Sequence, residues 1–169
     1  MRATTSMLGL VLCVGCASSH VTVREAFPPA EVASPWVLKD DVWSGSFAEA
    51  ATALGDDAET WARFGPTRVW LAVYCHADHP ERCLKVRCLA FGSTEDAGAA
   101  YAAFRPAVAK PFNAGDVGCW TEVGVLYRWG RLVFDIFGES ATWESQVQTT
   151  YLATLIGKRM PPGAPENPQ

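Results

Sequence analysis

The chain has 169 residues, with 14 basic and 18 acidic side chains and a formal net charge of −4 at pH 7. Neither this charge nor any local cluster of Lys and Arg gives the basic surface that nucleic-acid phosphates require, so we expect no nucleic-acid partner. Because 49% of the residues are hydrophobic, one domain with its own core is expected.

The first 15 residues predict an export signal. A positively charged start at Arg2 is followed by an apolar run over residues 7–14, far short of the roughly 20 residues that a membrane-spanning helix needs. Residues 12–16 (LCVGC) resemble a lipobox, in which a small residue precedes a cysteine that takes diacylglycerol and becomes the mature N-terminus. Cys16 is then the lipidated residue, and its fatty acyl chains, such as palmitate, attach the protein to a membrane. The alternative is an ordinary secretory signal cut near Ala17.

The segments on either side of the domain are expected to be a tether and a tail. Residues 16–35 are mixed and polar, which predicts a lipidated N-terminus and a tether, and the prolines of residues 161–169 predict a disordered tail. One domain then occupies residues 36–160. The residue after Cys16 is Ala17 rather than Asp, and by resemblance to the sorting of bacterial lipoproteins this implies the outer membrane, facing the periplasm, in a host that has one.

The first half of the domain predicts two helices and a hairpin. Residues 36–43 suit a first strand or a lead-in segment, and the Ala-rich residues 47–54 predict a helix. A short helix capped by Asp56 or Asp57 is expected to reach Phe64, before Gly65 and Pro66. The β-forming segments 69–75 and 83–91 predict a hairpin whose loop is residues 76–82.

The second half repeats this order. Ser93 and Asp96 predict the capped start of a helix that continues to Phe104. Residues 123–127 and 132–137 predict a second hairpin, and apolar residues at helical spacing from Trp143 predict a last helix that stops at Gly157. The order predicts an α+β fold, an antiparallel sheet of two hairpins with about 4–5 strands and with helices packed on one face.

Two motifs support a resemblance. Residues 54–65 (LGDDAETWARFG) precede a strand, and residues 90–93 (AFGS) precede a helix that carries Ala97 and Tyr101. In this pattern the chain resembles a family of exported bacterial lipoproteins with a domain of unknown function, over residues 54–138. The shared motifs are packing signals of small and aromatic residues, so the resemblance implies a fold and an address but no activity.

Four cysteines lie beyond Cys13 and Cys16, and in an exported protein an even set predicts disulfides. Cys75 and Cys83 flank the first hairpin loop. Cys88 shares a strand face with Trp70 and would point into the core toward Cys119. Of the three possible connectivities, strand parity favours Cys75 with Cys83 and Cys88 with Cys119.

The first hairpin loop also carries the main alternative function. Cys75, His76, His79 and Cys83 together offer two thiolates and two imidazoles, a set that suits zinc or copper. A small metal-binding or enzymatic domain that uses this loop is therefore the alternative. The four domain cysteines form no C-x-x-C redox pair, and the chain has no hydrolase signature or phosphate-binding loop. We expect a non-catalytic binding or scaffolding domain without a cofactor.

Acidic and aromatic side chains complete the candidates. Asp116, Glu122 and Asp135 have spacings that do not show whether they meet in space, and solvated surface acids are the commoner case. Trp129 lies in the turn of the second hairpin, where an exposed tryptophan can mark a surface for an envelope protein or a small ligand. The alternative is that its ring folds back on a neighbouring strand.

Overall fold

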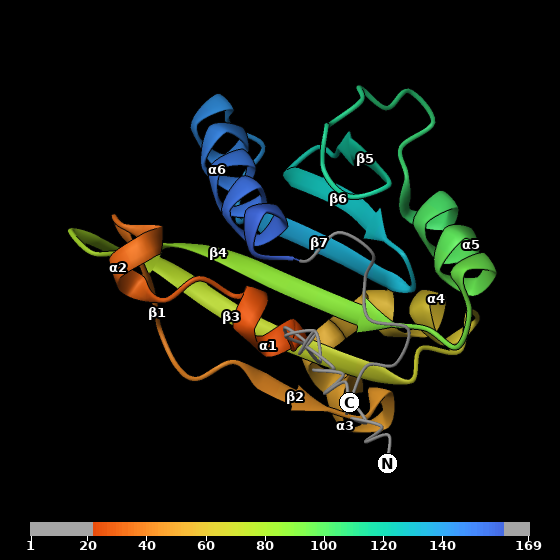
Figure 1. Ribbon diagram of the computed structural model, residues 1–169. Helices are drawn as coiled ribbons and strands as arrows, with labels where there is room; N and C mark the ends of the chain where they lie inside the picture. Colours follow the sequence, from red (N-terminus) through yellow and green to blue (C-terminus); the bar gives the residue numbers. More distant parts are fainter. Residues whose placement is uncertain (1–21, 161–169) are drawn as a thin grey trace, which may run out of the picture.

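The computed structural model describes residues 22–160, so the predicted export signal, the lipidated Cys16 and the Pro-rich tail lie outside the described residues. Within them an antiparallel sheet of seven strands is flanked by helices (Figure 1). The strands are β1 Trp36–Leu38, β2 Trp43–Gly45, β3 Arg68–His76, β4 His79–Ala90, β5 Val117–Trp120, β6 Gly124–Trp129 and β7 Leu132–Gly138. The helices are α1 Val23–Ala26, α2 Ala30–Ala33, α3 Phe47–Leu54, η1 Gly55–Asp57, α4 Ala58–Ala62, α5 Thr94–Phe104 and α6 Trp143–Arg159.

The strand order is β1-β3-β4-β7-β6-β5, and β2 pairs with β3 farther along the edge that β1 also uses. The first predicted hairpin is β3 and β4, but its strands run to His76 and from His79, so Ala77 and Asp78 alone form the turn. The expected loop 76–82 is therefore wrong at its C-terminal side. Of the polar residues 79–82, only His79 pairs across the ladder, with His76, and Pro80, Glu81 and Arg82 take up the shift in register between that pair and the Cys75–Cys83 pair.

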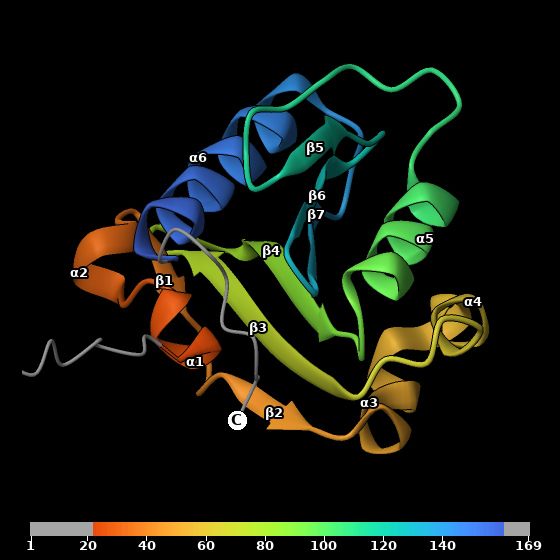
Figure 2. The same ribbon diagram turned by 45° about the vertical axis from the view of Figure 1, so that its right-hand side comes forward.

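Helices cover both faces of the sheet, as Figure 2 shows. Along β4, Leu84, Val86 and Cys88 point to one face, whereas Arg87 and Leu89 point to the other, as the alternation of a strand requires. The first face packs against α1, α2 and α6, and the second against α3, α4 and α5. The α+β class and the antiparallel pairing are confirmed. The expectation of helices on one face was too narrow, because the second face is also apolar where α5 and α4 cover it.

Residues 22–35 are part of the domain rather than of a tether. Val23, Ala26 and Phe27 are buried at helical spacing against the first face. The Tyr74 hydroxyl donates a hydrogen bond to the Pro28 carbonyl at 2.9 Å, and Arg159 Nε donates one to the Glu25 carbonyl at 3.0 Å. The prolines in this segment concealed the spacing in the sequence. The ordered domain therefore includes residues from 22 onward instead of beginning at 36.

Two more elements differ from expectation, the last helix in its end and β5 in its presence. The last helix passes the predicted stop at Gly157 and ends at Arg159. The Trp129 ring packs on the helix at Gly157, where a side-chain Cβ would lie 3.8 Å from the ring. Strand β5 was not predicted, because it is short and contains Gly118, which has little β-propensity. By contrast, α3 and α5 begin at the Ser46 and Ser93 caps and end as expected.

One of the two predicted disulfides is present. Cys75 and Cys83 are directly opposite in the β3–β4 register and are bonded. Cys88 and Cys119 are buried and not bonded to any cysteine of residues 22–160, so the second predicted pair is wrong. Cys88 points to the first face of β4, whereas Cys119 points to the second face of β5, with β7 and β6 between them.

The two core thiols should react only when the protein unfolds. Cys88 and Cys119 are 0% and 1% exposed, and burial raises the pKa of the Cys88 thiol, which keeps it from forming the reactive thiolate. We expect iodoacetamide without reductant to leave both unmodified in the native protein and to label both in urea. Peptide mapping checks this. A Cys88–Cys119 cross-linked peptide would contradict the sheet order.

Removing the disulfide should cost moderate stability. The bond closes a loop with a sequence separation of 8, and the chain-entropy relation gives about 2.6 kcal/mol for such a loop. We expect the Cys75→Ala/Cys83→Ala protein to unfold at a correspondingly lower urea concentration. The matched control is the unsubstituted protein in reductant, which should approach the same midpoint. A midpoint that reductant leaves unchanged would contradict this account.

Candidate functional site

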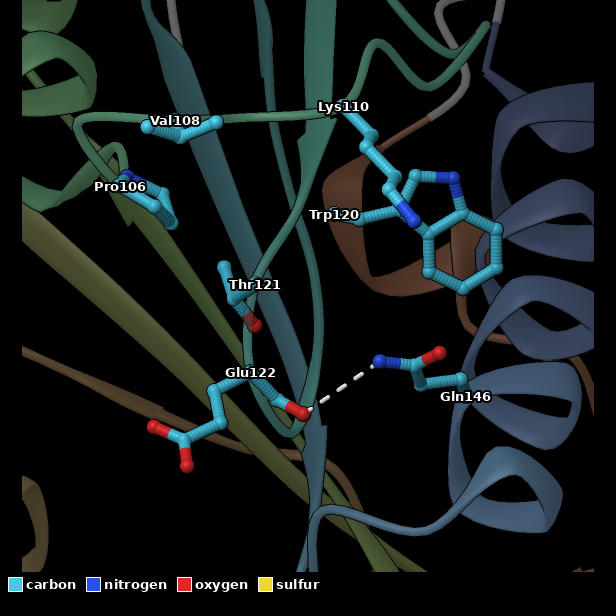
Figure 3. Close-up of a pocket in the computed structure, with 7 residues that line it drawn as sticks. All are labelled: Pro106, Val108, Lys110, Trp120, Thr121, Glu122 and Gln146. Carbon is cyan, nitrogen blue, oxygen red and sulfur yellow. Dashed lines mark hydrogen bonds between the residues drawn. The ribbon is translucent and has the colours of Figure 1, made fainter.

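Two cavities open on either side of the loop that joins β5 to β6, and Thr121 lines both. The larger, of about 580 Å³, is bounded by the segment after α5, the end of β5 and the first turns of α6. Figure 3 shows the Trp120 ring between Lys110 and Gln146, with Val108 across the opening. Val108 is 94% exposed, and Gln146 Nε2 donates a hydrogen bond to the Glu122 carbonyl at 3.5 Å. This cavity is broad, open and mixed in polarity.

The smaller cavity, of about 330 Å³, lies on the second face of the sheet where the helix layer ends. Its lining comprises Asp57 of η1, Arg87 of β4, Phe104 of α5, Thr121 and Val123 of the loop, Leu126 of β6, and Asp135 and Phe137 of β7. Three charged side chains are grouped here among apolar ones. Arg87 Nη1 lies 2.6 Å from Asp57 Oδ2 and 3.6 Å from Asp135 Oδ2, and its guanidinium lies over the Phe137 ring at 4.4 Å.

Strand register brings this charged group together. Arg87 and Asp135 are direct partners in the β4–β7 ladder, and both point to the face that carries Leu89 and Val133. Their side chains are only 14% and 17% exposed. Asp57 reaches Arg87 from the turn after α3, where Gly55 adopts a φ of 63° that favours glycine. Local turn geometry and long-range pairing are therefore both needed to form the cluster.

The Asp135 carboxyl is the unusual group of the cavity. Burial raises the pKa of Asp135 to about 6, the nearby Arg87 charge opposes this, and the Asp57 charge adds to it. Among the described residues, no group donates a hydrogen bond to this carboxylate. Asp57, in contrast, is half-buried and accepts a short charge-assisted bond from Arg87. The cluster holds one positive and two negative charges when Asp135 is ionised.

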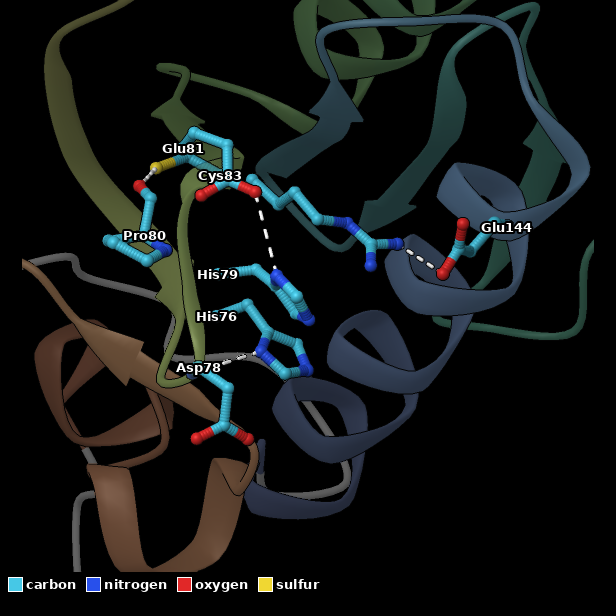
Figure 4. Close-up of polar contacts among 8 residues, drawn as sticks. His76, Asp78, His79, Pro80, Glu81, Cys83 and Glu144 are labelled. Atoms are coloured by element: carbon cyan, nitrogen blue, oxygen red, sulfur yellow. Dashed lines mark hydrogen bonds and ion pairs between the residues drawn. The ribbon is translucent and has the colours of Figure 1, made fainter.

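The predicted loop candidates lie at the outer end of the β3–β4 hairpin (Figure 4). His76 and His79 are neighbours, with ring centroids 5.2 Å apart, and the Trp36 ring meets His76 edge-on at 5.5 Å. The Asp78 backbone N–H donates a hydrogen bond to His76 Nδ1 at 3.2 Å. His79 Nδ1 lies 3.6 Å from a Glu81 oxygen. These contacts account for both rings locally.

The four-ligand metal set that the sequence suggested does not assemble. Cys75 and Cys83 are joined in the disulfide, so they are not available as thiolates. Within residues 22–160, no group of three or more His, Cys, Asp or Glu side chains is placed to hold a metal ion. Beside this loop, Arg82 forms an ion pair with Glu144 of α6, and this hydrogen bond and charge lower the pKa of Glu144. The pair joins the hairpin end to the start of the last helix.

Trp129 is half-buried and packs against the first hydrophobic cluster, next to α6. Its ring therefore contributes to the core and also keeps some surface. The other aromatic side chains of this hairpin divide between the two faces of the sheet. Tyr127 and Phe134 stack in the first cluster at 4.8 Å, whereas Phe137 faces the smaller cavity.

Sequence analysis named Asp135 only among three acids whose spacing left their relative positions open, and it did not name Arg87. A usable signal was present for Asp135, because it is the one charge in the apolar strand LVFDIFG, whereas Arg87 in LKVRCLA alternates with Lys85 as a solvent-facing side chain would. A charge at an inward strand position predicts a paired partner. Asp116, a second acid of that set, pairs instead with Arg128 at 3.4 Å and accepts a hydrogen bond from the Gly130 N–H.

No protein-family model, no curated protein and no solved structure matches this chain. The resemblance to exported lipoproteins therefore stays a prediction from the motifs. Within the described residues, no helix is both long enough and apolar enough to cross a membrane.

Proposed function

We propose that the chain is an exported lipoprotein, held at the cell envelope by lipid on Cys16, and that its α+β domain is a non-catalytic binding module. The disulfide between Cys75 and Cys83 is the observation that supports export of the protein. Such bonds persist in oxidising compartments and are rare in the cytosol. The two cavities that share Thr121 support the binding role, because they offer a concave surface of the size that envelope components or small ligands use.

The proposed anchor also restricts where the domain can lie. The structured domain includes Thr22, so six peptide steps separate it from Cys16. Even fully extended, they span only about 20 Å. The membrane, which is the proposed partner, is therefore close to α1. In a host that has an outer membrane, the domain lies beside it and faces the periplasm. This short connection replaces the longer tether that was expected over residues 16–35.

Mass spectrometry of the protein from a bacterial membrane fraction tests the proposal. We expect a mature chain that begins at Cys16 and carries diacylglycerol and a further acyl chain. Cys16→Ala should abolish the lipid and the membrane association, whereas the matched control Cys13→Ala should leave both unchanged. An unmodified N-terminus near Ala17 in the unsubstituted protein would overturn the anchor.

A further inference from the structure

The smaller cavity exists because the helix layer stops part-way across the second face. Residue Val133 of β7 lies under α5, but Asp135, the next residue on that face, lines open space beyond Phe104 at the end of the helix. Burial of a carboxylate is costly unless hydrogen bonds or an opposite charge compensate it. The fold therefore holds a costly group at a cavity wall, where a bound molecule can reach it.

The charges beside the cavity do not balance. Arg87 forms its short hydrogen bond with Asp57, at 2.6 Å, and approaches Asp135 only to 3.6 Å. One guanidinium thus faces two carboxylates, and Asp135, the less exposed of them, has no hydrogen-bond donor among residues 22–160. The cavity therefore presents one uncompensated negative charge and unused acceptor oxygens.

The remaining walls are apolar. Phe104, Val123 and Leu126 surround the carboxylate, while the guanidinium of Arg87 already covers the Phe137 ring. The volume of about 330 Å³ is at the lower end of the range for small-molecule sites. The cavity suits one small molecule with an apolar body and a single polar group.

We propose that this cavity binds a small organic amine, whose ammonium group donates hydrogen bonds to the Asp135 carboxylate while its apolar body lies against Phe104 and Val123. The ammonium supplies the donors that Asp135 lacks and brings the cluster to neutrality. This inference rests on the proposed binding role of the domain and adds the class of ligand.

Other ligand classes fit the same walls less well. An anion would have to displace Asp57 from Arg87, or else approach two carboxylates, and like charges repel strongly in a partly buried site. A neutral molecule of the same shape can donate one hydrogen bond to Asp135 but leaves its negative charge uncompensated. The charge of the ligand, rather than its apolar body, therefore determines selectivity.

Three ligands of one shape test this with the full-length chain. Benzylamine is cationic at pH 7.5, benzyl alcohol is neutral and benzoate is anionic. In NMR titrations we expect benzylamine to shift the signals of Phe104, Val123 and Leu126 saturably. Benzyl alcohol should bind at least about tenfold more weakly, because it supplies a hydrogen bond but no positive charge, and benzoate should not bind, because it is repelled by the carboxylates.

Two variants with the same change in charge separate the site from the general field of the protein. Asp135→Asn should weaken benzylamine binding by at least about tenfold. Asp56→Asn, an exposed neighbour of Asp57 that does not line the cavity, should leave it unchanged. Equal binding to the Asp135→Asn protein, or equal binding of benzyl alcohol, would overturn the amine site.

The titration of Asp135 gives a second readout without any substitution. Saturating benzylamine should lower the pKa of the Asp135 carboxyl, because a bound ammonium favours the ionised form, and benzyl alcohol, which has no charge, should lower it less. An unchanged pKa would overturn the proposal even if the Asn variant failed to fold. These results are independent of the lipid on Cys16, so a failed amine site leaves the anchor standing and a missing lipid leaves the amine site standing.

Discussion

Replacing Trp61 with alanine is expected to lower the free energy of unfolding by about 3 to 5 kcal/mol, the usual cost of removing a large buried ring. Trp61 is 0% exposed, stacks on Phe104 with ring centroids 3.7 Å apart and lies 6.5 Å from the Phe91 ring. Because α4 is only five residues long, this ring is the main attachment of that helix to α5. Urea unfolding followed by circular dichroism measures the loss.

Trp61→Phe is the matched control for this prediction. The Trp61 Nε1 donor is buried without a hydrogen-bond partner in the described part of the chain, so phenylalanine removes an unsatisfied donor while it keeps a ring against Phe104. We expect a loss below about 1.5 kcal/mol. If the alanine variant lost less than about 1 kcal/mol, the stacked pair would not attach α4 as the structure indicates.

The elements that sequence reasoning predicted well have strong local signals. Residues 47–54 and 94–104 combine helix-forming side chains with a capping serine, and the two hairpins combine β-forming runs with short polar turns. The Cys75–Cys83 disulfide could be predicted from the sequence because both cysteines belong to one hairpin, whose register is determined by its turn. Local periodicity was enough for these features.

The errors arose where distant segments meet. Pairing Cys88 with Cys119 required knowledge of β5, of the sheet order and of the face to which each thiol points. Helix cover on the second face and the packing of residues 22–35 also depend on contacts between elements far apart in the chain. A single sequence has no local pattern that determines such contacts.

The charged cavity shows the same limit at the level of function. The charge in each strand was visible, but the meeting of Arg87 with Asp135 depends on the β4–β7 register, and the meeting with Asp57 depends on where η1 lies. The sequence could indicate that Asp135 needs a partner. Only the fold shows that Arg87 is shared between two carboxylates.

Asp135→Asn is expected to raise the free energy of unfolding at pH 7 by about 3 kcal/mol. Burial, opposed by Arg87, raises the pKa of Asp135 from 3.8 to about 6, and each unit of difference between the folded and unfolded states corresponds to about 1.4 kcal/mol. Asparagine removes this cost of ionisation. Arg87 keeps Asp57 at 2.6 Å, so the substitution does not leave an unpaired buried charge.

The pH dependence gives the sign of this effect. Between pH 4 and about 6, the folded protein retains the Asp135 proton that the unfolded chain has released, so unfolding releases a proton and a rise in pH favours unfolding. The unsubstituted protein should therefore lose stability relative to the Asn variant across this window. The two should converge below about pH 4 and keep a constant difference above about pH 7.

Urea unfolding of both proteins from pH 3 to 8 measures this difference, in which the contributions of groups such as Glu49 and Glu95 cancel because both proteins contain them. Asp56→Asn should show no such pH-dependent gain. An Asp135→Asn protein less stable than the original at pH 7 would mean that Arg87 already compensates the ionised carboxylate fully. The cavity would then lack the unpaired charge that an amine needs, so stability and ligand selectivity test the same property of Asp135.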